Sequence, residues 1–140
     1  FSDDVDFLFT VSPVRHWKDG AIENTRSKSV LHLAIQELVL QFENVFYFPS
    51  YEIVMDELRD YRFFKEDMLH PNEQAVDYVW ERFRETYFSG ETNNLTSRVE
   101  QFNQLRSHKV LHPESDSAKR HLNKINKELV ELQKILPQFT

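Results

Sequence analysis

The chain of 140 residues has no cysteine. This absence excludes disulfide frameworks, thiolate metal sites and thiol nucleophiles, although it leaves the redox compartment open. The chain also lacks an apolar run near the roughly 20 residues that a membrane-spanning helix needs, and it has no segment with the layout of a signal peptide. These absences favour a cytoplasmic location, but they do not determine the compartment.

Basic residues are the minority among the charged ones. The chain has 17 Lys and Arg against 23 Asp and Glu, for a formal net charge of -6. Such a charge creates no general field that would attract nucleic-acid phosphates or an anionic membrane surface, so we expect neither as a partner. With 40% hydrophobic and 29% charged residues, the composition is that of an ordinary folded domain with a real core.

The first part of the chain alternates apolar runs with a helical pattern. Residues 7–14 (FLFTVSPV) and 45–51 (VFYFPSY) are aromatic and β-branched, and we interpret them as strands, the first buried on both faces as in a parallel sheet. Between them, residues 27–42 predict a helix with Ser27 or Ser29 as its N-cap. A strand, helix and strand of this length form a right-handed parallel crossover in nearly all cases. The sequence therefore predicts an α/β fold here.

The segment KEDMLHPNEQA, residues 65–75, places an aspartate and a histidine three residues apart just before an amphipathic helix, with Pro71 suited to the first turn. A carboxylate can hold a histidine in one tautomer through Nδ1–H, which leaves Nε2 free to take a proton from a serine hydroxyl. Asp67 and His70 are therefore candidates for the orienting acid and the general base of a triad. The alternative is that Asp67 caps the helix or sits in a polar turn and that His70 is a surface residue, because short motifs recur by chance.

After Gly90 the pattern changes to polar helices. Residues 92–110 and 115–136 each carry an apolar stripe, and the LHPESD segment between them predicts a turn. This pattern indicates an antiparallel α-helical hairpin with coiled-coil-like packing. We expect an α/β part at residues 1–90 and this hairpin extension at residues 91–140. The stripe of the hairpin, or an exposed sheet edge, would allow a homodimer.

Several segments in order carry a resemblance to a known family: TVSPVRHWKDG, SKSVLHLAIQEL and YFPSYEIVMDELRDYRFFKEDMLHPNEQAVDYVWERF. Together they resemble the GSCFA family, a bacterial branch related to the SGNH/GDSL hydrolases, and the likeness runs from residue 7 to about 88. It implies that residues 1–90 are the C-terminal part of a flavodoxin-like, three-layer α/β domain with parallel strands and flanking helices. It also implies that Asp67 and His70 serve a triad whose serine lies upstream and attacks an ester carbonyl.

The chain departs from the family at the nucleophile. The Gly-Ser-Cys-Phe-Ala motif is missing, because there is no cysteine and the only glycines are Gly20 and Gly90. The glycine and asparagine positions of the oxyanion site are missing too. Ser12 precedes Pro13 where the family has the same Ser-Pro, and we interpret its role as backbone geometry. We therefore expect this polypeptide alone to be inactive and its natural N-terminus to lie upstream of Phe1.

Polar residues that follow the two predicted strands are candidates for substrate binding. Arg15 and His16 follow the first strand, and Ser50 and Glu52 follow the second. In open parallel sheets, ligands bind outside the carboxyl ends of the strands. Each of these residues can equally be an ordinary surface residue of its loop.

The remaining histidines give little support to metal binding. His32 lies on or beside the apolar face of its helix, as packed histidines do. His108, His112 and His121 flank the predicted hairpin turn without the i, i+4 partner of a typical zinc pair. We expect no metal and no other cofactor.

Three functions stay open at this point. The leading one is an SGNH-type serine hydrolase that acts on a small-molecule ester or an acylated carbohydrate, with acyl transfer to another acceptor as its variant. The second is a pocket that binds a ligand without turnover. The third is an association module built on the helical hairpin.

Overall fold

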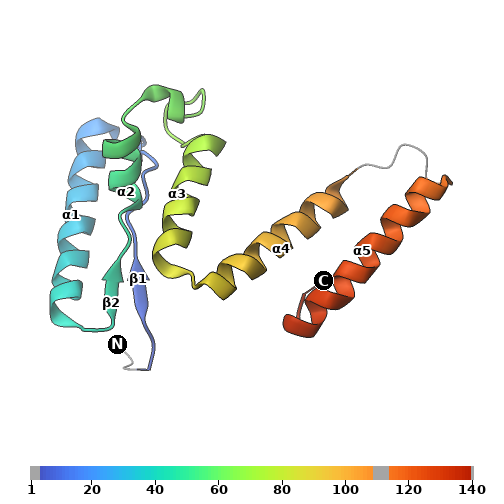
Figure 1. The fold of residues 1–140 in the computed structure, drawn as a ribbon. Coiled ribbons are helices and arrows are strands. Elements are labelled where there is room, and N and C mark those ends of the chain that lie inside the picture. The colour runs from blue at the N-terminus through green and yellow to red at the C-terminus, as the bar shows by residue number, and fades with distance from the viewer. Residues whose placement is uncertain (1–3, 109–113, 140) are drawn as a thin grey trace. The chain divides into compact units, whose positions relative to one another are not determined.

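The computed structural model describes residues 4–108 and 114–139. The chain divides into two compact units, which are described separately below. Unit 1 is Phe1–Tyr87 and unit 2 is Phe88–Thr140 (Figure 1).

Two short parallel strands lie at the centre of unit 1. Strand β1 (Phe7–Phe9) pairs with β2 (Val45–Tyr47), and Leu8 lies opposite Phe46. Helix α1 (Gly20–Gln41) connects the strands, so the predicted strand, helix and strand are present in parallel arrangement. Unit 1 is therefore of mixed α/β class.

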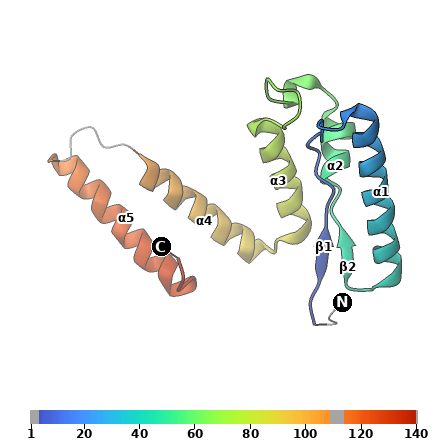
Figure 2. The same cartoon turned by 180° about the vertical axis from the view of Figure 1, so that it is seen from behind.

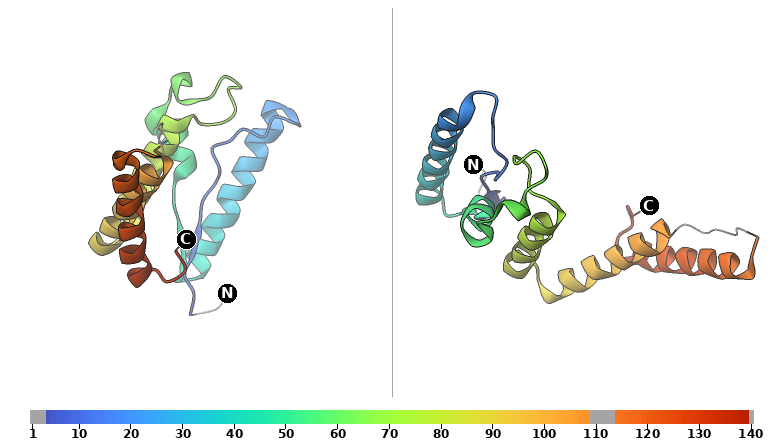
Figure 3. Two further views of the ribbon diagram at one scale, coloured as in Figure 1. Left: turned by 90° about the vertical axis from the view of Figure 1, so that its right-hand side faces the viewer. Right: turned by 90° about the horizontal axis from the view of Figure 1, so that it is seen from above.

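Helices α1 and α3 (Glu73–Tyr87) lie on opposite sides of this small sheet, as the view from above shows (Figure 3, right) and the reverse view also shows (Figure 2). Tyr47 lines a pocket together with residues of α1. The next residue, Phe48, contacts Phe83 of α3 with ring centroids 5.2 Å apart. Because successive side chains of a strand point to opposite faces, Tyr47 and Phe48 meet different helices.

The first strand is shorter and less buried than the sequence predicts. β1 ends at Phe9, and within it Leu8 is 39% exposed. Phe46, on the same face, is 44% exposed. The prediction of a strand buried on both faces is therefore wrong for the described chain, because α3 covers Phe48 and leaves Leu8 and Phe46 partly open to solvent.

Strand β2 also ends early, at Tyr47 and not at residue 51. Pro49 has no N–H for a ladder hydrogen bond, and the chain turns directly into a helical segment made of α2 (Ser50–Glu52) and the π-helix η1 (Ile53–Leu58). A 3-10 turn, η2 (Tyr61–Phe63), follows. This stretch supplies buried side chains to the core, among them Ile53, Val54 and Phe63.

Helix α1 begins at Gly20, well before the predicted caps Ser27 and Ser29. Ser29 lies inside the helix, where its hydroxyl donates to the carbonyl of Thr25 at 2.9 Å. A serine that bonds back to the preceding turn is tolerated in a helix interior, so its presence does not mark a helix start. The residue before the helix is Asp19, whose side chain makes no capping hydrogen bond.

Unit 2 contains the two predicted helices, α4 (Gly90–Ser107) and α5 (Asp116–Ile135), which run antiparallel (Figure 1). The Ser115 hydroxyl caps α5 by accepting from the N–H of Ala118 at 3.1 Å. Phe102 and Leu132 are the most deeply buried large side chains of this unit. The apolar stripe of each helix is therefore directed, at least in part, into the hairpin's own core.

Part of the apolar surface of α5 stays open. Leu122, Val130 and Ile135 are each more than half exposed, so self-association through the hairpin stays a prediction. Within residues 4–108 and 114–139, no helix has both the length and the apolar character that crossing a membrane requires.

Candidate active site

The loop between η2 and α3 is held by backbone hydrogen bonds at its base. Phe64 and Pro71 form an antiparallel bridge, and the Lys65 N–H donates to the His70 carbonyl at 2.8 Å. At the tip, Met68 has a φ of 58°, in the left-handed region that is costly for a residue with a side chain. The loop between residues 65 and 70 is thus a closed turn.

Asp67 organises this turn through both of its carboxylate oxygens. Oδ1 accepts hydrogen bonds from the backbone N–H groups of Leu69, at 2.9 Å, and His70, at 3.0 Å. Oδ2 lies 2.7 Å from Nδ1 of His70. The side chain of His70 is 54% exposed and that of Asp67 is 45% exposed, so the pair faces solvent.

The same contacts lower the pKa of Asp67 from its ordinary value of 3.8 to about 2. The largest cause is the backbone N–H of His70, followed by the N–H of Leu69 and then the His70 ring. Asp67 is therefore ionised at neutral pH and can only accept hydrogen bonds. Since it can only accept, Nδ1 of His70 carries the proton in this contact, and Nε2 of the neutral ring is left as a proton acceptor.

We expect the Asp67 carboxyl to titrate near pH 2 in a ¹³C NMR experiment. A pKa that is lowered on folding means that the ionised form stabilises the loop. This stabilisation is complete above about pH 4 and is lost as the pH falls through the folded value of about 2. In His70→Ala the pKa should rise only part of the way, because both backbone donors remain, and a return to the ordinary value would contradict this assignment of causes.

The proposed alternative role of Asp67 as the cap of the following helix is wrong. Asn72 caps α3, with Oδ1 accepting from the Ala75 N–H at 3.1 Å and Nδ2 donating to the Arg62 carbonyl at 2.6 Å. Pro71 precedes this cap and does not lie in the first turn, which starts at Glu73. Asp67 lies in a polar turn of its own and holds His70, and the catalytic role of the pair stays a prediction.

Arg15 is the one predicted binding residue that contacts this loop among the described residues. Its backbone N–H donates to the Leu69 carbonyl at 3.4 Å. Its guanidinium carbon lies 5.8 Å from the ring centroid of Tyr61 and 5.3 Å from that of Phe64. The loop that follows β1 therefore places Arg15 against Leu69, the residue next to His70.

His16 is directed elsewhere. Its Nε2 lies 3.5 Å from Oδ2 of Asp19, and both side chains are more than half exposed. Its backbone N–H donates to the side chain of Asn24 at 2.8 Å. These contacts tie His16 to the first turn of α1, and no hydrogen bond or ion pair links it to the Asp67 loop in the part of the chain described.

Ser50 is a buried serine that joins the ends of the two strands. It is 7% exposed, and its hydroxyl donates to the Val11 carbonyl at 3.0 Å. Its oxygen is also 2.5 Å from the hydroxyl of Thr10. Ser12, in contrast, accepts from the Val14 N–H at 3.2 Å in a local turn. Neither serine has a hydrogen bond to His70 in the residues described.

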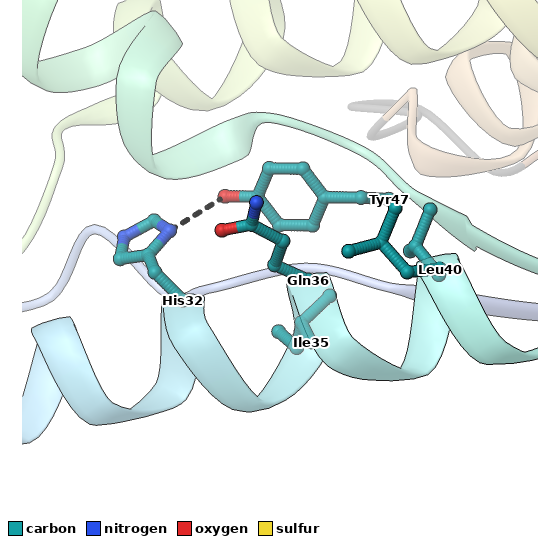
Figure 4. Close-up of a pocket in the computed structure, with 6 residues that line it drawn as sticks. His32, Ile35, Gln36, Leu40 and Tyr47 are labelled. Carbon is teal, nitrogen blue, oxygen red and sulfur yellow. Dashed lines mark hydrogen bonds between the residues drawn. The ribbon is translucent and has the colours of Figure 1, made fainter.

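Glu52 belongs to a separate cluster between α1 and β2. Its Oε2 accepts from the Tyr47 hydroxyl at 2.8 Å, and its Oε1 lies 3.5 Å from Nδ1 of His32. Burial, followed by the hydrogen bond to Glu52, raises the pKa of Tyr47. Figure 4 shows the Tyr47 hydroxyl directed at the His32 ring, at one end of a pocket of about 310 Å³. No hydrogen bond or ion pair joins this cluster to Asp67 or His70 in the described residues.

The histidines of unit 2 show no metal geometry in the residues described. The rings of His108 and His121 lie 5.4 Å apart, and His112 lies outside the described residues. Within residues 4–108 and 114–139, no group of three or more His, Cys, Asp or Glu side chains is arranged to hold a metal ion.

An apolar cleft of about 470 Å³ lies between the sheet and α3. It is lined by Leu8, Thr10, Phe48, Ser50, Val76, Val79, Trp80 and Phe83. The apolar stripe of α3 is visible in the sequence. That this stripe leaves room against the strands could not be foreseen, because the gap depends on how far the helix stands from the sheet.

Comparison with protein-family models matches residues 1–83 to the model described as the GSCFA family. Comparisons with curated proteins and with solved structures give no significant match. The matched region contains β1, α1, β2, the Asp67 loop and most of α3.

Proposed function

The chain belongs to the GSCFA family, and on that premise we propose that Asp67 and His70 are the orienting acid and the general base of a serine hydrolase of the SGNH type. The substrate class is an ester or an O-acyl carbohydrate. The observation that carries the proposal is the 2.7 Å contact between Asp67 Oδ2 and His70 Nδ1, with Oδ1 held by two backbone N–H groups.

The geometry suits a base that must stay in one tautomer. Because two backbone donors hold Oδ1, the carboxylate cannot rotate away without breaking both of these hydrogen bonds. Oδ2 is then held against Nδ1, and Nε2 of the half-exposed ring forms no hydrogen bond with the residues that the structure describes. These are the tasks of the base and its orienting partner in a serine triad.

In the proposed reaction, Nε2 of neutral His70 removes the proton from a serine hydroxyl as its oxygen attacks the acyl carbon. Asp67 stabilises the imidazolium that results. The imidazolium then gives the proton to the departing alkoxide, which leaves as the alcohol, and an acyl-enzyme remains. A water molecule, or an acceptor alcohol in acyl transfer, then attacks the acyl carbon while it gives its proton to the same Nε2. The bond to the serine oxygen breaks, that oxygen takes the proton back from the imidazolium, and the acid or the new ester is released with the serine restored.

The proposal places the nucleophilic serine outside residues 1–140, because this chain lacks the Gly-Ser-Cys-Phe-Ala motif. The finer fold assignment belongs to the same proposal: unit 1 is the C-terminal part of a flavodoxin-like, three-layer domain. What supports it is the pair of parallel strands with α1 on one side and α3 on the other. The carboxyl ends of such strands are where α/β domains place their ligands.

A fluorophosphonate probe tests the proposal in the complete native protein that contains this chain. We expect stoichiometric covalent labelling of one serine, mapped by mass spectrometry of peptides, together with hydrolysis of p-nitrophenyl acetate. Heat-denatured protein is the control for non-specific labelling. Native protein that neither takes up the probe nor hydrolyses esters would contradict the proposal.

A further inference from the structure

Two arginines beside the Asp67 loop have no carboxylate partner. Arg15 is half-buried and Arg59 is exposed, and neither forms an ion pair or a side-chain hydrogen bond with any residue in 4–108 or 114–139. Most of the other arginines in the described chain pair with an acid, for example Arg82 with Glu85 at 2.8 Å. In a chain with a formal net charge of -6, two guanidinium groups without acids indicate a function other than structural pairing.

Both arginines line one small pocket of about 180 Å³. Its other lining residues are Val54, Met55, Asp60, Tyr61 and Phe64. Apolar side chains form part of the wall, and the rings of Tyr61 and Phe64 hold the Arg15 guanidinium by cation–π contact. The Arg15 guanidinium is therefore held in place before a ligand binds and is partly shielded from water. Both features favour ligand binding in comparison with a freely moving surface arginine.

The pocket shares its wall with the loop of the catalytic pair. The Arg15 N–H is bonded to the Leu69 carbonyl, one residue before His70. Phe64 forms the antiparallel bridge with Pro71, one residue after His70. A group bound at Arg15 would thus lie beside the loop that carries His70.

The charges of the pocket favour an anion. Arg15 and Arg59 contribute two positive charges, and Asp60 contributes one negative charge. Asp60 is already engaged by Arg62, whose N–H donates to Oδ1 at 2.9 Å and whose Nε lies 3.8 Å from Oδ2. The net charge of the lining residues is therefore +1, and the positive charge is carried by the two guanidinium groups that have no acidic partner.

We propose that this pocket binds an oxyanion, a carboxylate or a phosphate, carried by the substrate of the hydrolase. The word substrate here rests on the function proposed above, whereas anion binding itself does not. A guanidinium recognises such groups through parallel N–H···O hydrogen bonds. Sites for whole drug-sized ligands measure about 300–1,000 Å³, so a pocket of about 180 Å³ suits one charged group of a larger molecule.

The first part of the test measures anion binding in the complete native protein. The protein is titrated with inorganic phosphate and, separately, with acetate, and binding is monitored by NMR of the arginine Nε–Hε groups. We expect Arg15→Gln to weaken binding of the preferred anion by about tenfold or more, because a charge-assisted hydrogen bond is lost. Arg59→Gln should weaken it less. Arg82→Gln is the matched control: the Arg82 guanidinium also lies over a ring, that of Tyr78 at 4.9 Å, but Arg82 belongs to α3 and does not line the pocket.

The second part compares the hydrolysis of p-nitrophenyl acetate with that of a p-nitrophenyl ester carrying a free carboxylate or phosphate. Arg15→Gln should raise KM for the charged ester by a larger factor than KM for the neutral ester, and Arg15→Lys should restore part of this difference. A purely structural role of Arg15 would change both esters alike. Unaltered anion binding in Arg15→Gln would overturn the inference even if the hydrolase is active, whereas anion binding lost in Arg15→Gln without any hydrolysis would support the site and count against the proposed reaction.

Discussion

Replacing His70 with alanine in the complete native protein is expected to lower kcat for ester hydrolysis by about 10³–10⁴-fold. The physical reason is that Asp67, the carboxylate that contacts His70, cannot replace it, because its pKa of about 2 makes it a very weak base. The measurement is the steady-state rate with p-nitrophenyl acetate. Added imidazole should restore part of the rate, because the ring is half-exposed and its removal leaves an accessible space.

The fold should survive this change. The backbone of His70 makes the bonds that close the loop, and a substitution of the side chain retains them. His16 offers a matched control, because it is also an exposed histidine paired with an aspartate three residues away, at 3.5 Å. We expect His16→Ala to keep nearly full activity. If His70→Ala keeps activity within about tenfold of the native protein, His70 is not the base.

Asp67→Asn is expected to produce the second large loss, about 10²–10⁴-fold in kcat. Oδ1 of the asparagine can still accept from the N–H groups of Leu69 and His70, which directs its amide NH₂ at Nδ1 of His70. An NH₂ group can only donate, so Nδ1 must become the acceptor and the ring proton moves to Nε2. The histidine then presents a donor where the serine needs a base.

This change of tautomer can be measured apart from the rate. The ¹⁵N chemical shifts of His70 should show the proton on Nδ1 in the native protein and on Nε2 in Asp67→Asn. Glu66→Gln is the control, because it removes a charge from the neighbouring position in the same exposed turn. If Asp67→Asn has the Nε2–H tautomer and an unchanged rate, the tautomer of His70 does not limit catalysis.

Local patterns predicted the elements better than their ends. The 3.6-residue periodicity located α1, α3, α4 and α5, because an amphipathic stripe repeats along the whole helix. The ends of β1 and β2 were misplaced, because apolar residues after Phe9 and Tyr47 continue the pattern of a strand while the chain has already left the ladder. Hydrophobicity indicates burial, and it does not specify the hydrogen-bond partner of the backbone.

The start of α1 shows the same limit. Ser27 and Ser29 have the side chains of good caps, yet the helix includes both and begins at Gly20. A cap preference is worth about 1 kcal/mol. The first turns of α1 are mostly exposed, and hydrogen bonds tie them to the preceding loop: the His16 N–H donates to Asn24 Oδ1, and Lys28 Nζ donates to the Ser12 carbonyl. Such bonds can outweigh a term of that size.

At the site, the pairing of Asp67 with His70 follows from the local sequence. The two residues are three apart in a short turn, so local hydrogen bonds to Leu69 and His70 suffice to bring Oδ2 to Nδ1. The family membership also follows from sequence, over residues 1–83.

Which of the other polar residues lie beside that pair depends on tertiary contacts. Arg15 meets Tyr61, Phe64 and the carbonyl of Leu69, whereas Glu52 turns to Tyr47 and His32. All four candidates follow a strand, so their position in the sequence is equivalent. Their partners differ because contacts between residues far apart in the chain depend on how the crossover helix, the strands and the loop pack, and no local pattern carries that information.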